Sequence, residues 1–235
     1  DHDPPAFALD AAREALNGNW HKYSPVNGYA DVRAAIANKF ERDNGLSFTP
    51  DQIVISTGAK QALINVIMSL VGPGDEVVIP APFWVSYASQ VELAGGIPVI
   101  VRSTLEEDWK VPVERIAAAI TPKTRLLMFS SPCNPSGSVL TRAEHEALAE
   151  EVAKHKDLYV IADEIYEHII YGVDEDDRIA RVALVDARIG DGMLALEPLP
   201  GDAADAVHRM AHLVEHLRHV AVVPAAAEAI GDLLD

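Results

Sequence analysis

The sequence has 235 residues, a length that allows one large domain or one domain with a smaller companion. Hydrophobic residues make up 49% of it and charged residues 23%, which excludes wholesale disorder. The formal net charge of -17 repels phosphate backbones and anionic lipids, so we expect neither nucleic-acid nor membrane partners. No apolar run is long enough to span a membrane. The single cysteine, Cys133, fits a reducing compartment, and we therefore expect a cytoplasmic protein.

The first predicted elements are two helices, over about residues 6–17 and 30–43, which a turn-rich segment separates. From about residue 50 to 163, short β-rich runs alternate with helical stretches. This alternation is typical of βαβ units that build a mainly parallel sheet with flanking helices. The predicted fold class is therefore α/β.

Strands and helices follow one another closely in this region. The expected strands cover residues 52–56, 77–79, 98–101, 125–129 and 158–162, and the expected helices cover 59–70, about 84–93, and a stretch that begins near Thr141. Thr141 and Glu144, three residues apart, are typical of a capping box at the start of a helix.

The composition changes near Gly172. The residues after it are rich in acids and contain arginine but no lysine. A hairpin around Gly190, a helix from Asp202 to about 220, a short strand over 220–223 and a final helix over 225–234 are expected there. The chain is therefore predicted to divide into residues 1–172 and a tail of residues 173–235.

Polar residues follow the carboxyl ends of several predicted strands, where ligands bind in open α/β sheets. Gly58 allows close approach to the backbone, and the helix start after it offers N–H groups to an anion. Trp84 supplies a flat ring and Asn134 an amide. Asp163 and Tyr166 supply a carboxylate and a phenol. Together these groups describe a pocket for a planar, phosphorylated, cationic heteroaromatic ring.

A series of ordered sequence blocks resembles the class I and II pyridoxal-phosphate-dependent aminotransferases, specifically their aspartate aminotransferase-like group. The blocks are Lys22-Tyr23-Ser24-Pro25, Ser56-Thr57-Gly58-Ala59-Lys60-Gln61-Ala62-Leu63, Pro82-Phe83-Trp84-Val85-Ser86-Tyr87, Asn134-Pro135-Ser136-Gly137 and Asp163-Glu164-Ile165-Tyr166-Glu167. The resemblance covers residues 1–172 and implies an incomplete large domain of fold type I. The tail, 173–235, is then a remnant of the small C-terminal domain or, alternatively, an unrelated segment.

The resemblance also implies how pyridoxal 5'-phosphate would be held. Asp163 would pair with the protonated pyridine nitrogen, so that the ring can accept electrons. Asn134 and Tyr166 would hydrogen-bond the phenolate oxygen of the ring. Trp84 would stack on the ring face.

The remaining implied roles concern the phosphate, the partner subunit and the substrate. Gly58, Ala59 and Lys60 would surround the phosphate. Tyr23 would reach the phosphate of a neighbouring subunit, which implies a homodimer. Substrate would meet Lys60, through its distal carboxylate, together with Trp84 and Asn134.

The family's Schiff-base lysine has no counterpart in this sequence. The lysines are Lys22, Lys39, Lys60, Lys110, Lys123, Lys154 and Lys156. In the family, the lysine follows the Asp-Glu-Ile-Tyr segment, but no lysine follows Lys156 here. We therefore expect no catalytic residue and no turnover by this chain alone.

The resemblance implies a catalytically incomplete aminotransferase. Its intact relatives would move an amino group from an acidic amino acid such as aspartate to a 2-oxo acid. Two other interpretations of function remain open. One is a non-catalytic binding or interaction protein with a vestigial cofactor site, and the other is a pyridoxal-phosphate-dependent lyase. His208, His212 and His216 have a spacing that can hold a metal, but a polar helix face explains it equally well, so no metal site is expected.

Overall fold

The structure, a computed structural model, describes residues 3–18, 20–171 and 220–222. The chain forms two compact units: Asp1–Gly58 with Val223–Asp235, and Ala59–Val222. The hairpin predicted around Gly190, the helices predicted over 202–220 and 225–234, and the three histidines all lie outside the described residues.

The smaller unit is helical. It contains α1 (Ala6–Asn17), α2 (Ala30–Asn44) and the short 3-10 helix η1 (Pro50–Gln52), so both helices predicted here are confirmed. The segment after α2 packs against it. The rings of Phe40 and Phe48 have centroids 5.0 Å apart, and Arg33 donates a hydrogen bond of 2.6 Å to the carbonyl oxygen of Pro50.

The strand predicted over residues 52–56 is wrong. Gln52 ends η1, and the residues after it belong to none of the strand pairs in the described part of the chain. Ile55 donates one backbone hydrogen bond, of 3.1 Å, to Asn27. An apolar run has the composition of a strand, but a strand forms only where a neighbour supplies a continuous hydrogen-bond ladder.

The larger unit is a parallel sheet with helices between its strands. The strands are β1 (Glu76–Ala81), β2 (Ile97–Arg102), β3 (Thr124–Ser130), β4 (Tyr159–Asp163) and β5 (Val220–Val222), and the helices are α3 (Ala59–Leu70), α4 (Ser86–Leu93), α5 (Val113–Ala119) and α6 (Arg142–Ala153). The strand order is β2-β1-β3-β4-β5, and every pair is parallel. The predicted α/β class is confirmed.

Most local predictions for this unit are also confirmed, with two differences. Thr141 caps α6, and its backbone N–H donates to Glu144 at 2.6 Å, as in the predicted capping box. Trp84 precedes α4 and is not part of it. The short helix α5 was not predicted, because only Ile116 among its residues is buried.

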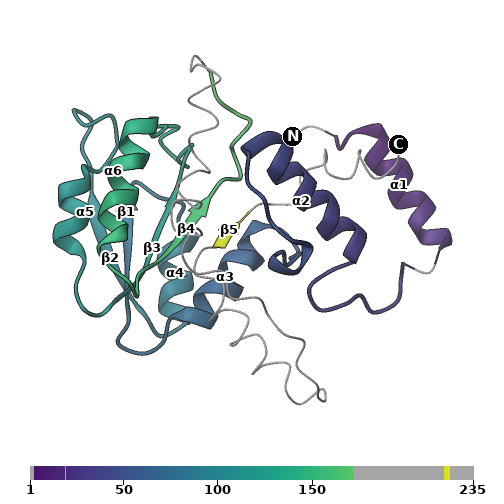
Figure 1. Ribbon diagram of the computed structural model, residues 1–235, viewed down its shortest axis with the longest axis horizontal. Coiled ribbons are helices and arrows are strands. Elements are labelled where there is room, and N and C mark those ends of the chain that lie inside the picture. Colours follow the sequence, from purple (N-terminus) through teal and green to yellow (C-terminus); the bar gives the residue numbers. More distant parts are fainter. Residues whose placement is uncertain (1–2, 19, 172–219, 223–235) are drawn as a thin grey trace. The chain divides into compact units, whose positions relative to one another are not determined.

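Alternate residues of the strands face two separate cores. Val77, Ile79 and Met128 pack with α3 and α4, while Val78 and Phe129 pack with α5 and α6. Figure 1 shows the corresponding layers, with α5 and α6 on one side of the sheet and α3 and α4 on the other. Both faces of the sheet are therefore covered, as is usual for parallel sheets.

The last strand comes from the tail of the chain. The strand predicted over 220–223 is formed by Val220–Val222, which pairs with β4 in parallel. In this register Asp163 lies opposite Val222. The division of the chain at Gly172 stays a prediction.

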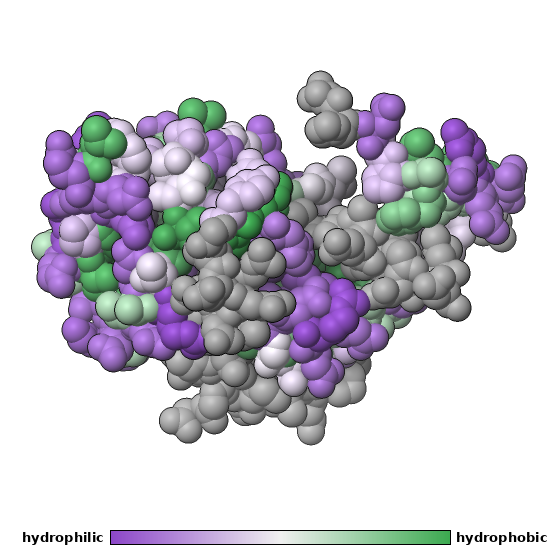
Figure 2. Space-filling view, turned by 90° about the horizontal axis from the view of Figure 1, so that it is seen from above, coloured by the Kyte–Doolittle hydropathy of each residue, from purple (hydrophilic) through white to green (hydrophobic). Residues whose placement is uncertain are grey.

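Hydrophilic residues predominate on the coloured surface of Figure 2, and hydrophobic patches lie between them. None of the helices in the described ranges is long and apolar enough to cross a membrane. The same residues contain no group of three or more His, Cys, Asp or Glu that could hold a metal ion.

Candidate functional site

The carboxyl ends of β1, β3 and β4 carry half of the predicted site residues. Ser130, the last residue of β3, lies in register with Asp163, the last residue of β4. Because the strands are parallel, the loops that leave them emerge at the same edge of the sheet. Trp84 follows β1, Asn134 follows β3 and Tyr166 follows β4, so the three residues lie on loops that leave neighbouring strands at this edge.

Asp163 is buried at this edge and accepts a hydrogen bond from a tyrosine. The hydroxyl of Tyr87, on the first turn of α4, donates to Asp163 Oδ2 at 2.7 Å. The backbone N–H of Ile165 donates to Oδ1 at 3.4 Å. Asp163 is 4% exposed and Tyr87 0%. The carboxylate is thus held on both of its oxygens away from solvent.

Burial changes the protonation of both partners. It raises the pKa of Asp163 above its usual range, although the hydrogen bonds from Tyr87 and Ile165 oppose that rise. Burial, together with the negative charge of Asp163, also raises the pKa of the Tyr87 phenol. Tyr87 therefore stays protonated at neutral pH and acts as the hydrogen-bond donor of the pair.

The surroundings of Asp163 fit the cationic end of the cofactor that the sequence predicts. The recorded partners of its carboxylate are a phenol and a backbone amide, and no cationic side chain within the described residues pairs with it. A buried carboxylate without a cation is costly. A protonated ring nitrogen beside Asp163 would remove that cost.

Asn134 and Tyr166, the two groups predicted to contact the ring oxygen, lie together. Asn134 follows β3 and Tyr166 follows β4, and the Asn134 side-chain amide donates to the Tyr166 hydroxyl at 3.1 Å. Because the Tyr166 oxygen accepts this bond, its own proton can be donated elsewhere. The pair can therefore present a hydroxyl proton to an anionic oxygen.

Lys60 and Trp84 also lie together. The Lys60 ammonium is 4.8 Å from the centroid of the Trp84 ring, within the range of a cation–π contact. Gln90 of α4 donates to the Lys60 carbonyl oxygen at 3.0 Å, which holds the start of α3 against α4. Trp84 in turn contacts Tyr87 edge-on, with centroids 5.8 Å apart.

The glycine turn before α3 has the backbone that the sequence predicts. Gly58 has a φ of +84° and donates a hydrogen bond of 2.8 Å to Ser56, so the turn is tight. Only glycine adopts this conformation at low cost. Ala59 and Lys60 then begin α3, where helix geometry gives the backbone N–H groups no acceptor within the helix itself.

Tyr23 belongs to the smaller unit, where its side chain is fully exposed. Its role toward a neighbouring subunit stays a prediction. Tyr87 is the site residue that sequence reasoning missed. The signal was available, because Tyr87 lies three residues after Trp84 and a buried tyrosine hydroxyl nearly always has a partner.

Other lysines of the larger unit are paired elsewhere. Lys110 contacts Glu144, Lys154 contacts Glu151, and Lys156 lies 4.0 Å from Asp157. Lys60, by contrast, contacts the ring of Trp84, a predicted cofactor-binding residue.

Comparison with known families gives one match over most of the chain. Residues 1–195 match the sequence model of the family described as aminotransferase class I and II. The matched range extends beyond Gly172, where we predicted that the resemblance ends.

Curated relatives are similar over the same part of the chain. An aspartate/prephenate aminotransferase of Cereibacter sphaeroides is 44% identical over 171 residues, which are 73% of this chain and 43% of that protein. A bifunctional aspartate aminotransferase and glutamate/aspartate-prephenate aminotransferase of Petunia hybrida is 46% identical over 171 residues, 73% of this chain and 36% of that protein. The chain thus spans less than half the length of these relatives.

Solved structures agree with this similarity. The aspartate aminotransferase of Thermus thermophilus with maleate has a TM-score of 0.71 at 43% identity, and the match covers 77% of this chain and 47% of that one. The aspartate aminotransferase of Rhizobium meliloti has a TM-score of 0.75 at 31% identity, covering 92% of this chain and 56% of that one.

Proposed function

Because this chain belongs to the family of class I and II aminotransferases, whose cofactor is pyridoxal 5'-phosphate, we propose that it binds this cofactor without completing a turnover by itself. The observation that carries the proposal is Asp163, a buried carboxylate whose recorded partners, Tyr87 and the Ile165 amide, are both neutral.

The cofactor, when bound, supplies a ring that accepts electrons from a substrate carbon. Asp163 would hold the proton on the ring nitrogen, and the bond from Tyr87 keeps the Asp163 carboxylate oriented. Tyr166 would donate a hydrogen bond to the ring oxygen, and Asn134 positions the Tyr166 hydroxyl. Trp84 would cover one face of the ring.

The phosphate is assigned to the turn before α3. Gly58 lets the backbone come close to the phosphate. The N–H groups of Ala59 and Lys60 lie at the N-terminus of α3, which is the positive end of the helix dipole. Lys60 adds a positive charge and is held near the site by its contact with Trp84. Together with Trp84 and Asn134, Lys60 also meets the substrate.

The reaction proposed for the whole protein is the transfer of an amino group from an acidic amino acid such as aspartate to a 2-oxo acid. The names of the similar proteins support this substrate class. The chain spans less than half of such a protein, and no lysine follows Lys156. We therefore propose that it does not form the covalent link to the cofactor that catalysis requires.

Two further proposals concern the setting of the protein. A homodimer is proposed because Tyr23 matches the family residue that reaches a neighbouring subunit. A cytoplasmic location is proposed because the sequence has one cysteine and an acidic composition.

Titration of the full chain with pyridoxal 5'-phosphate tests the proposed function. We expect saturable, reversible binding, followed by absorbance and by Trp84 fluorescence. Asp163→Asn should weaken binding at least about tenfold, because it removes a charge-assisted contact. Asp157→Asn, at an exposed aspartate, is the matched control and should leave binding unchanged.

Two outcomes would contradict the proposal. If the full chain does not bind the cofactor, the cofactor site is vestigial, and an interaction protein becomes the better interpretation. If borohydride treatment gives a stoichiometric adduct in the mass spectrum and aspartate is turned over, another lysine, such as Lys60, forms the covalent link.

A further inference from the structure

A second pocket lies on the face of the sheet that α5 and α6 cover. Its volume is about 340 Å³, within the range of small-molecule sites. Its walls are mostly apolar and include Pro82, Phe83, Val113, Ile116, Phe129 and Leu148. An aromatic or branched aliphatic group would therefore be desolvated inside it.

This pocket is separate from the proposed cofactor site. None of the residues proposed to hold the cofactor lines it. Ile116, Phe129 and Leu148 belong to the core under α5 and α6, whereas Trp84 and Tyr87 pack with the core under α3 and α4. Most walls of the pocket thus belong to the face that α5 and α6 cover, while Phe83 packs with the other core and stacks on Tyr87 with centroids 6.3 Å apart.

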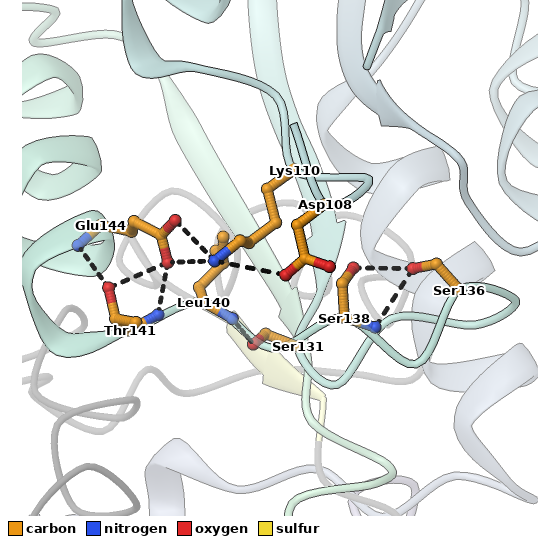
Figure 3. Close-up of polar contacts among 8 residues, drawn as sticks. All are labelled: Asp108, Lys110, Ser131, Ser136, Ser138, Leu140, Thr141 and Glu144. Atoms are coloured by element: carbon orange, nitrogen blue, oxygen red, sulfur yellow. Dashed lines mark hydrogen bonds and ion pairs between the residues drawn. The ribbon is translucent and has the colours of Figure 1, made fainter. Parts of the chain in front are cut away.

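Charged groups of both signs meet at one end of this pocket. Lys110 and Glu144 both line it. The Lys110 ammonium lies 2.8 Å from Glu144 Oε1, 3.0 Å from Oε2 and 3.8 Å from Asp108 Oδ2. Figure 3 shows Lys110 between the two carboxylates. Asp108 itself does not line the pocket, and Glu107, which does, is paired with Arg115 at 2.6 Å.

The Glu144 carboxylate is fixed in place by the helix it caps. Its Oε2 accepts hydrogen bonds from the backbone N–H and the hydroxyl of Thr141, at 2.6 and 2.9 Å. Burial would raise the pKa of Glu144, but the bonds from Lys110 and Thr141 outweigh it and lower the pKa, so the carboxylate stays ionised at neutral pH. Since Thr141 and Glu144 already cap α6, the helix start is not an anion site.

The Lys110–Glu144 pair can exchange partners at little cost. The side chains of Lys110 and Glu144 keep 19% and 37% of their surface exposed, so the pair borders solvent, and a ligand that replaces both charges leaves neither group unpaired. A ligand with a single charge would satisfy one partner and leave the other unpaired. A zwitterion satisfies both.

We propose that this pocket binds an apolar α-amino acid. The side chain of the ligand fills the apolar cavity, its carboxylate contacts the Lys110 ammonium, and its ammonium contacts the Glu144 carboxylate. Because Phe83, Trp109 and Phe129 line the pocket, an aromatic side chain fits these walls.

Isothermal titration of the full chain with L-phenylalanine, without added pyridoxal 5'-phosphate, tests this proposal. We expect saturable binding, accompanied by a change in the fluorescence of Trp109. Phenethylamine and 3-phenylpropanoate, which each keep one charge, should bind at least about tenfold more weakly. If either analogue binds as tightly as L-phenylalanine, recognition of a zwitterion is wrong. If none of the three binds, the pocket is not an amino-acid site.

Variants locate the binding. Lys110→Met should weaken L-phenylalanine binding at least about tenfold, whereas Lys154→Met, which breaks a similar lysine–glutamate pair outside the pocket, should not. Val113→Phe, which narrows the pocket without touching its charges, should also weaken binding. Melting temperatures show whether each variant is folded. Unchanged binding by folded Lys110→Met and Val113→Phe proteins would overturn the proposal.

The failure of this proposal is distinguishable from failure of the proposed function. Asp163→Asn should weaken binding of pyridoxal 5'-phosphate and leave L-phenylalanine binding unchanged. If Asp163→Asn abolishes L-phenylalanine binding while Lys110→Met does not, the amino acid occupies the cofactor edge of the sheet and the second pocket is not its site.

Discussion

Tyr87 and Asp163 are 76 residues apart in the sequence, yet the hydroxyl of one donates to the carboxylate of the other at 2.7 Å in the interior of the larger unit. The bond joins the first turn of α4 to the end of β4. It therefore links a helix that begins just after Trp84 to the strand end that carries the proposed nitrogen-binding carboxylate. Substitutions at either residue should affect both folding and cofactor binding.

Tyr87→Phe removes the donor and leaves the buried carboxylate with only the Ile165 amide. We expect the free energy of unfolding to fall by about 1–3 kcal/mol, the usual range for a buried group that loses its partner. Tyr171→Phe, at an exposed tyrosine, should change it by less than about 0.5 kcal/mol. Urea unfolding measures both. Equal stabilities for the two variants would mean that the bond contributes nothing.

The stability of the protein should depend on pH through Asp163. Its pKa is raised in the folded state, while the unfolded chain has the ordinary value of 3.8. The folded state thus binds a proton that the unfolded chain has released, so this contribution is present at low pH and is lost as the pH rises through the raised value. Asp163→Asn does not titrate, so its stability relative to the unsubstituted chain should increase as the pH rises above about 4. The free energy of unfolding of both proteins, measured as a function of pH, tests this. A difference between them that does not change with pH would contradict the prediction.

Thr141→Ala tests the capping box of α6. It removes the hydroxyl that accepts from the Glu144 N–H, and we expect a loss of about 0.5–2 kcal/mol of unfolding free energy. Glu146 lies on the same helix, but its carboxylate is exposed and its ion pair with Arg142 is long, at 4.0 Å. Glu146→Gln should therefore change the free energy of unfolding by less than about 0.5 kcal/mol. Denaturant unfolding of both variants makes the comparison. Similar losses would show that the cap is not the cause.

Gly58→Ala and Gly74→Ala form a matched pair. Both glycines have positive φ, +84° and +92°, and an added Cβ would meet nothing within 4 Å at either position. Each substitution should therefore cost about 1–2 kcal/mol through backbone strain alone. Only Gly58→Ala should also weaken binding of pyridoxal 5'-phosphate, because Gly74 lies in the turn after α3 and outside the proposed site. Equal cofactor affinities would remove Gly58 from the phosphate site.

The sequence predicts the strands of the sheet well where both faces are buried. Leu126, Leu127, Met128 and Phe129 form a continuous apolar run, and the structure buries it between the two cores. The run at 52–56 also has consecutive apolar residues, Ile53, Val54 and Ile55, but forms no strand, because composition does not reveal whether a neighbouring strand exists. The short helix α5 was missed for a related reason, since one buried residue, Ile116, gives no periodic pattern.

The candidate site was predicted by residue type but not by contact. The sequence places Asn134 and Tyr166 after neighbouring strands, and their hydrogen bond follows from that placement. The contact of Lys60 with the Trp84 ring and the bond from Tyr87 to Asp163 depend on how α3 and α4 pack together. Side-chain packing of this kind is set by the tertiary fold, and the local sequence pattern does not specify it.

The position of β5 affects the order in which the sheet assembles. β1, β2, β3 and β4 pair over shorter sequence separations than β4 and β5 do. Closing a longer loop costs more chain entropy, so the four-stranded part can form before Val220–Val222 docks. During synthesis, β4 is therefore an open edge until Val220–Val222 has been made and can pair with it. The strand that ends at Asp163 becomes an interior strand of the sheet only through that pairing.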